Sequence, residues 1–150
     1  MPYYERQHFS RGLLIGLFFV ALAASGIALV ATVRVGELWL SAVIISVAML
    51  PSLLGFLLRL ETRVEDGVLS VRLTPFRPRR IALSDVVRAE VRTYHPIREY
   101  GGWGIRWGRG GMAYNARGNQ GVQLELKDGR CVLIGSQEPE RLLAAVRAGG

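Results

Sequence analysis

The sequence predicts a membrane protein: a two-helix transmembrane hairpin, then a small antiparallel β-barrel or curved sheet with one C-terminal α-helix. Two uncharged stretches, residues 12–33 and 38–58, each have the roughly 20 residues that a helix needs to span a hydrocarbon core. After residue 58, apolar and polar residues alternate in short segments separated by turn signals. We therefore expect a tail over residues 1–11, a hairpin over 12–58 and a domain over 59–150.

The four-residue break between the two stretches, Arg34 to Glu37, is too short for anything but an antiparallel pair of helices. Both ends of the pair then emerge on one side of the bilayer. Arginines flank those ends, whereas the break carries one arginine and one glutamate. The positive-inside rule predicts a multi-pass protein of the inner (plasma) membrane with both termini in the cytoplasm. An Ala-Leu-Ala site at residues 21–23 resembles a signal-peptide cleavage site, but the apolar run is too long for one, so we expect an uncleaved anchor.

Small residues at helical spacing occur in the first stretch, where Gly12 and Gly16 form a GxxxG motif. We expect them to pack against the second stretch, and homo-oligomerisation stays open as the alternative. Neither stretch contains an ionisable residue, which argues against an ion pathway or a proton relay.

The region after the hairpin reads as about seven short strands and one helix. Asp66-Gly67 and Asp128-Gly129 are typical of two-residue β-hairpin turns. Residues 69–73 alternate as a half-buried strand does, and residues 112–116 fit a short return strand. Ser136 is a candidate cap for a last helix that runs through Arg147.

The charge balance bears on partners, because the chain has a formal net charge of +7. Arg77, Arg79 and Arg80 form the densest basic cluster. This cluster is either a solvated loop or a contact for anionic lipid headgroups. No nucleic-acid-binding motif accompanies the charge, so nucleic acid is not an expected partner.

The sequence predicts a strand in which Trp103, Ile105 and Trp107 share one face, because side chains two residues apart point the same way. They are buried either inside the domain, under the C-terminal helix, or outside, against lipid or a protein partner. We expect the inside position, with Gly104 and Arg106 facing solvent, because a domain this small needs bulky core residues. The outside position would make the three residues a partner surface.

Four phrases after the hairpin carry a resemblance to the bacterial pleckstrin-homology-like membrane proteins: residues 73–76 (LTPF), 100–106 (YGGWGIR), 118–122 (GNQGV) and 133–137 (LIGSQ). The resemblance covers roughly residues 60–148 and points to an uncharacterised branch of that group. It implies a fold rather than an activity. The first turn, Glu65-Asp66-Gly67, is acidic, so the basic phosphoinositide site of the lipid-binding members does not carry over.

No constellation of catalytic residues is evident. Ser84, Asp85 and His95 lack the motifs of a catalytic triad, and the glycine run at 101–111 lacks a phosphate-binding pattern. Two histidines and one cysteine at scattered spacing make no metal site. We therefore expect no enzyme activity, metal or cofactor. The expected function is a membrane-anchored binding or scaffold module; the alternative is an accessory subunit of a membrane-bound enzyme or transport complex.

Overall fold

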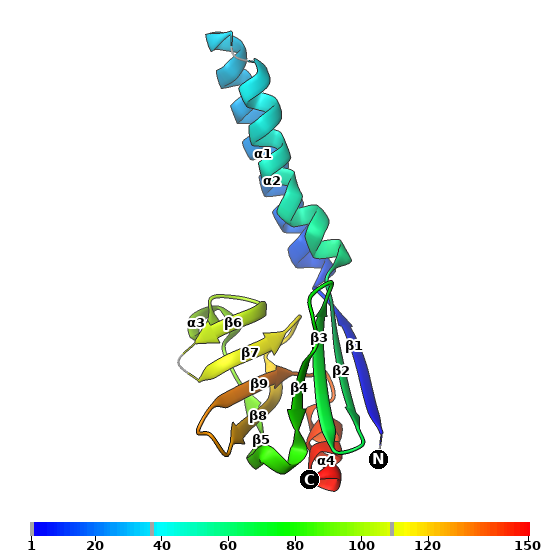
Figure 1. Ribbon diagram of the computed structural model, residues 1–150. Coiled ribbons are helices and arrows are strands. Elements are labelled where there is room, and N and C mark those ends of the chain that lie inside the picture. The colour runs from blue at the N-terminus through cyan, green and yellow to red at the C-terminus, as the bar shows by residue number, and fades with distance from the viewer. Residues whose placement is uncertain (1, 37, 109) are drawn as a thin grey trace. The chain divides into compact units, whose positions relative to one another are not determined.

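The computed structural model describes residues 2–36, 38–108 and 110–150, and the chain forms two compact units (Figure 1). One is a helical unit over Phe9–Leu58. The other is a β domain that contains Arg59–Gly150 together with the residues before Phe9. The helical unit is thus an insertion within the β domain.

The helical unit consists of α1 (Arg11–Val35) and α2 (Leu38–Leu57), so the prediction of two helices with a tight break is confirmed. Gly36 ends α1 in the left-handed conformation with φ 81°, and its N–H bonds to the carbonyls of Thr32 and Val33. This is the usual role of a glycine just after a helix.

The two helices pack within the chain, as expected, but the GxxxG motif does not make the contact. A Cβ added at Gly16 would meet nothing within 4 Å. The close approach lies instead at Gly55, where an added Cβ would come within 2.4 Å of Leu14 Cδ2. The buried residues of α1 are Leu14, Ala21, Ser25 and Thr32, at spacings of seven and four that place them on one side of the helix.

Both helices are long and apolar enough to cross a membrane, by length and composition alone. Most of their large apolar side chains face outward; Phe19, Val20 and Ile27 are more than 60% exposed. The two helices therefore cover little of each other's apolar surface.

The β domain contains two sheets rather than the single closed barrel that was one predicted option. The four-stranded sheet is antiparallel in the order β1 (Tyr3–His8), β2 (Arg59–Glu65), β3 (Val68–Thr74), β4 (Arg79–Ala82). The five-stranded sheet has the order β5 (Val86–Thr93), β8 (Gln120–Leu126), β9 (Cys131–Gly135), β7 (Gly111–Asn115), β6 (Gly104–Gly108). In that sheet β7 and β9 are parallel and the other pairs are antiparallel.

The prediction of a separate tail over residues 1–11 is wrong for Tyr3–His8. These six residues form β1, which pairs with β2 from Tyr3–Val64 to His8–Arg59. Tyr3 and Gln7 are buried, and the Gln7 Nε2 donates to the Gly135 carbonyl of the other sheet at 2.8 Å. The prediction failed because β1 finds its partner across the 50 residues of the helical unit, which no local pattern reveals.

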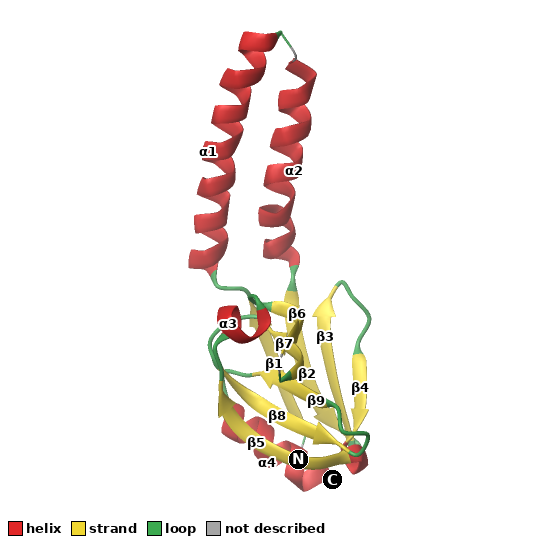
Figure 2. Ribbon diagram, turned by 90° about the vertical axis from the view of Figure 1, so that its left-hand side faces the viewer, coloured by secondary structure: helices red, strands yellow, loops and turns green. Residues whose placement is uncertain are grey.

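Two helices cover different parts of the sheets (Figure 2). The C-terminal helix α4 (Pro139–Gly149) is present as predicted and packs mainly on β5, β8, β2 and β1, with Leu142, Leu143 and Val146 buried. The short helix α3 (Pro96–Tyr100), which the sequence analysis did not predict, packs beside β6. Pro96 begins α3 at a position where its missing N–H costs nothing.

Candidate functional site

The structure separates the three arginines of the predicted basic cluster. Arg77 is exposed in the loop between β3 and β4. Arg79 and Arg80 lie on β4, where alternation sends their side chains to opposite faces. The Arg79 Nη1 lies 2.9 Å from the sulfur of Met112 on β7, which connects the edge of one sheet to the other. The three arginines therefore do not form one surface patch, although Arg79 and Arg80 both border one cleft.

Arg79 and Arg80 line a cleft of about 280 Å³ between β4 and the β8–β9 turn. The other charged residues of its lining are Asp85, Lys127, Asp128 and Arg130. The sequence analysis missed this arrangement, because β4 and the turn are almost 50 residues apart and come together only through the packing of the two sheets.

The expectation that Trp103, Ile105 and Trp107 lie inside the domain under the C-terminal helix is wrong. Trp107 is 73% exposed, and Ile105 is half-buried. Trp103 precedes β6, is half-buried, and its indole Nε1 donates to the Gly118 carbonyl at 3.2 Å. Arg106 faces solvent as expected, but Gly104 is buried.

The face of Ile105 and Trp107 was nevertheless the core-facing one. They pair with Tyr114 and Met112 of β7, which in turn pair with the buried Ile134 and Val132 of β9. Directly paired residues point to the same face of a sheet. That face is uncovered at β6 because, within this sheet, α4 packs mainly on β5 and β8, at the other end of the strand order. The exposure of Trp107 fits the alternative of an outside position, and a partner at this face stays a prediction.

A second small core accounts for much of the glycine-rich segment. Tyr94, Tyr100, Ala113 and Leu133 form a buried cluster on the other face of the five-stranded sheet, with the two tyrosine rings edge to face at 6.0 Å. Burial raises the pKa of both phenols. A Cβ at Gly108 would lie 2.2 Å from the Glu99 carbonyl oxygen, so close packing against α3 explains that glycine.

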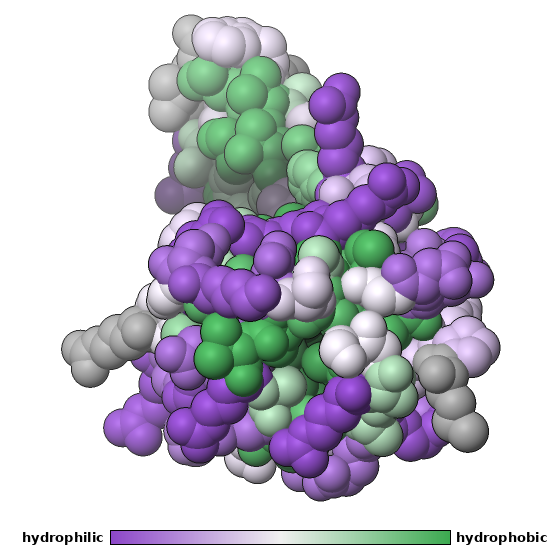
Figure 3. All heavy atoms as spheres, turned by 60° about the horizontal axis from the view of Figure 1, so that its bottom comes forward, coloured by the Kyte–Doolittle hydropathy of each residue, from purple (hydrophilic) through white to green (hydrophobic). Residues whose placement is uncertain are grey.

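Other exposed apolar side chains of the domain are dispersed: Phe76 in the β3–β4 loop, Val87 on β5 and Ile97 on α3 are each more than half exposed. Figure 3 shows apolar side chains between hydrophilic ones on the side of the domain where β5 begins and α4 ends. There a shallow cavity of about 410 Å³ lies between Val86, Val87 and Val146.

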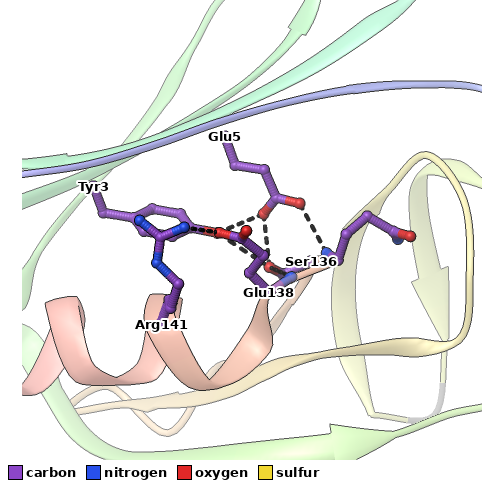
Figure 4. A network of polar contacts seen from close by, with 6 residues as sticks. Tyr3, Glu5, Ser136, Glu138 and Arg141 are labelled. Carbon is purple, nitrogen blue, oxygen red and sulfur yellow. Dashed lines mark hydrogen bonds and ion pairs between the residues drawn. The ribbon is translucent and has the colours of Figure 1, made fainter.

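A polar network ties β1 to the start of α4, and it joins residues that the sequence analysis did not connect (Figure 4). The Glu5 Oε2 accepts hydrogen bonds from the Tyr3 hydroxyl and the Ser136 hydroxyl, both at 2.6 Å. The Glu5 Oε1 accepts from the Gln137 N–H at 2.8 Å, and the Ser136 hydroxyl accepts from the Glu138 N–H. Burial and the bond to Glu5 raise the pKa of Tyr3. The network holds the N-terminal strand in the domain and is a structural clamp.

The structure places no catalytic triad or metal cluster among the residues it describes. Asp85 precedes β5 and His95 follows it, so the eight residues of an extended strand separate them. The described residues contain no group of three His, Cys, Asp or Glu side chains placed to hold a metal ion.

Comparison with known proteins identifies no relative: no family model matches the chain, and no curated protein matches it.

Proposed function

We propose that this chain is a membrane-anchored binding module. In this proposal α1 and α2 cross the inner membrane, both termini are cytoplasmic, and a pleckstrin-homology-like domain is held at the bilayer for a protein or lipid partner. One observation carries the proposal: the apolar helical hairpin is inserted between β1 and β2, two strands that pair over six residues.

The outward surface of the helices supports a bilayer as their surroundings. Side chains such as Phe19, Ile27 and Val47 are more than 60% exposed on this unit. Soluble proteins rarely expose contiguous apolar patches above a few hundred Å², because such patches associate. The outward faces of the two helices are apolar over most of their length, and lipid removes that surface from water.

The two connections between the helices and the domain are short, which supports a domain held close to the bilayer. The chain leaves β1 at His8 and enters β2 at Arg59, and these two residues pair directly. Only Phe9 and Ser10 lie between β1 and α1, and only Leu58 lies between α2 and β2. Neither connection is long enough to act as a flexible linker.

The β3–β4 loop is the part of the domain best suited to contact headgroups. Thr74 at the end of β3 pairs with Arg59, so the loop begins at the same end of the strands at which the chain leaves β1 and enters β2. It presents Phe76, which is 54% exposed, beside Arg77. An aromatic side chain with adjacent arginine suits the interface of an anionic membrane.

The architecture of the domain supports the pleckstrin-like part of the proposal. A four-stranded antiparallel sheet is followed by a second sheet, and a C-terminal helix packs on strands of both. Such a fold carries binding functions of many kinds, so the partner has to be found from its surface.

Cysteine labelling in intact cells tests membrane insertion and topology. In a Cys131→Ser background, Gly36→Cys should react with an impermeant maleimide before lysis, because the α1–α2 turn would face away from the cytoplasm. The matched control Ser84→Cys, exposed in the domain, should react only after lysis.

Labelling of Gly36→Cys only after lysis would overturn the orientation. Release of the protein from membranes by alkaline carbonate would overturn membrane insertion itself. Both readouts are independent of any partner.

A further inference from the structure

The cleft between β4 and the β8–β9 turn has walls that are held in place by backbone hydrogen bonds. The Lys127 N–H donates to the Asp85 carbonyl at 2.9 Å, and the Leu83 N–H donates to the Gly67 carbonyl at 2.8 Å. Within the turn, the Arg130 N–H donates to the Asp128 Oδ1 at 3.0 Å. The charged side chains of the cleft therefore project from two edges of fixed backbone.

The charges that line the cleft do not cancel. The lining holds four basic side chains, Arg79, Arg80, Lys127 and Arg130, against the carboxylates of Asp85 and Asp128. Arg130 neutralises Asp128 through its Nε and Nη2 at 2.6 and 2.5 Å, and these bonds hold the pKa of Asp128 below its usual value. Three basic side chains then remain against one carboxylate, which leaves an excess of two positive charges.

None of these three side chains forms an ion pair with any residue that the structure describes. Among the residues that the structure describes, the Arg79 Nη1 donates to the sulfur of Met112, a weak acceptor. Elsewhere in the domain, arginines form ion pairs: Arg6 pairs with Glu61, and Arg92 pairs with Glu99. The cleft thus gathers more cationic donors than carboxylates in a concave site, and such a site concentrates anions.

We propose that this cleft binds a phosphate monoester, carried by a small soluble ester or by a phospholipid headgroup. A phosphate monoester carries up to two negative charges near neutral pH, which matches the charge excess. Guanidinium groups donate paired hydrogen bonds to its oxygens, and Lys127 adds a point charge. A volume of about 280 Å³ suits one phosphate with a small substituent rather than a nucleotide cofactor. The proposal does not depend on membrane insertion.

Calorimetric titration of the full chain in a neutral detergent, with glycerol 3-phosphate at low salt, tests the proposal. Arg80→Gln and Lys127→Gln, on opposite walls, should each weaken binding about tenfold, because each removes charge-assisted hydrogen bonds. Asp85→Asn should tighten binding about two- to fivefold, because it removes a like charge at a partly exposed site. The matched control Arg117→Gln removes the same charge from an exposed site outside the cleft and should leave binding unchanged.

A second arm of the titration distinguishes the two sources of phosphate. Dihexanoyl phosphatidic acid replaces the soluble ester, and dihexanoyl phosphatidylcholine, a diester without a monoester phosphate, is its control. Binding of phosphatidic acid alone, lost in Arg80→Gln, supports the headgroup; binding of glycerol 3-phosphate supports a soluble ligand. No binding of either at millimolar concentration, or an equal loss in Arg117→Gln, overturns the site. If one wall variant does not fold, the variant on the other wall tests the same cleft.

Discussion

Strands β3 and β6 carry similar alternating patterns and have opposite fates. In β3, Leu69, Val71 and Leu73 are at most 4% exposed. In β6, Ile105 and Trp107 lie on the core-facing side of their sheet, yet Trp107 is 73% exposed. The difference lies in what covers the core-facing side of each strand. Edge position alone does not explain it, because Tyr3 on the edge strand β1 is buried, whereas in the five-stranded sheet α4 packs mainly on β5 and β8 and not on β6. Alternation therefore predicts which face a side chain takes, and the neighbouring elements decide whether that face is buried.

Removal of β1 should have the largest effect on the stability of the domain, because it turns β2 into an edge strand. A fragment over residues 59–150 loses the buried Tyr3 and Gln7 and should not fold cooperatively. A chain in which residues 9–58 are replaced by Asn-Gly, a two-residue hairpin turn that suits the direct pairing of His8 with Arg59, should fold. Circular dichroism during heating measures both, and a fragment that melts like the Asn-Gly chain would contradict the role of β1.

Leu69→Ala should cost about 2–5 kcal/mol of unfolding free energy, because it leaves a cavity where a fully buried side chain stood. The matched control is Val87→Ala, which truncates a side chain that is 64% exposed and should change stability by less than about 0.5 kcal/mol. Urea unfolding of the full chain in detergent, followed by near-ultraviolet circular dichroism, compares the two. Equal effects would mean that burial in β3 is not what stabilises this sheet.

Glu5→Ala should weaken the attachment of β1 to the domain without removing the strand. The substitution removes three hydrogen bonds to a carboxylate and should cost about 2 kcal/mol. Glu61→Ala on the neighbouring strand removes a partly exposed ion pair with Arg6 and should cost less than about 1 kcal/mol. The same unfolding assay measures both, and the clamp is refuted if Glu61→Ala is the more costly.

Alkaline pH should weaken the domain through its buried tyrosines. Burial raises the pKa of Tyr3, Tyr94 and Tyr100 above the usual value of about 10. Above that pH the unfolded phenols lose their protons while the folded ones keep them, so stability is present below pH 10 and falls as the pH rises. The slope is about 1.4 kcal/mol per pH unit for each tyrosine involved. Tyr94→Phe should reduce that slope, and a stability independent of pH above 10 would show that these phenols ionise in place.

Trp107→Ala should have the smallest effect on stability, less than about 0.5 kcal/mol, because its side chain is 73% exposed. The loss of a buried tryptophan would cost about 3–5 kcal/mol. The same urea assay separates the two values, and a loss in the larger range would mean that another element or another copy of the chain covers β6.

Some elements could be predicted from the sequence and others could not. The two helices, the Asp66-Gly67 turn, the strand over residues 69–73 and the C-terminal helix follow from local patterns, and the structure contains all of them. These features depend on neighbours in sequence: periodicity, chain length in apolar residues, and glycines at positive φ. The short helix α3 was missed because its five residues are too few to show a helical period, although Pro96 and Gly101 mark its two ends.

Pairings between distant segments depend on the tertiary structure. β1 meets β2 across the helical insertion, Glu5 meets Ser136 from the far end of the chain, and Arg79 meets the β8–β9 turn in the basic cleft. The exposure of Trp107 is also a tertiary effect, since α4 packs mainly on β5 and β8, at the other end of the strand order from β6. Local residue types indicate which segments are apolar, charged or able to form turns. Which of them become neighbours depends on how two sheets and a helix share one core, and that is a property of the assembled domain.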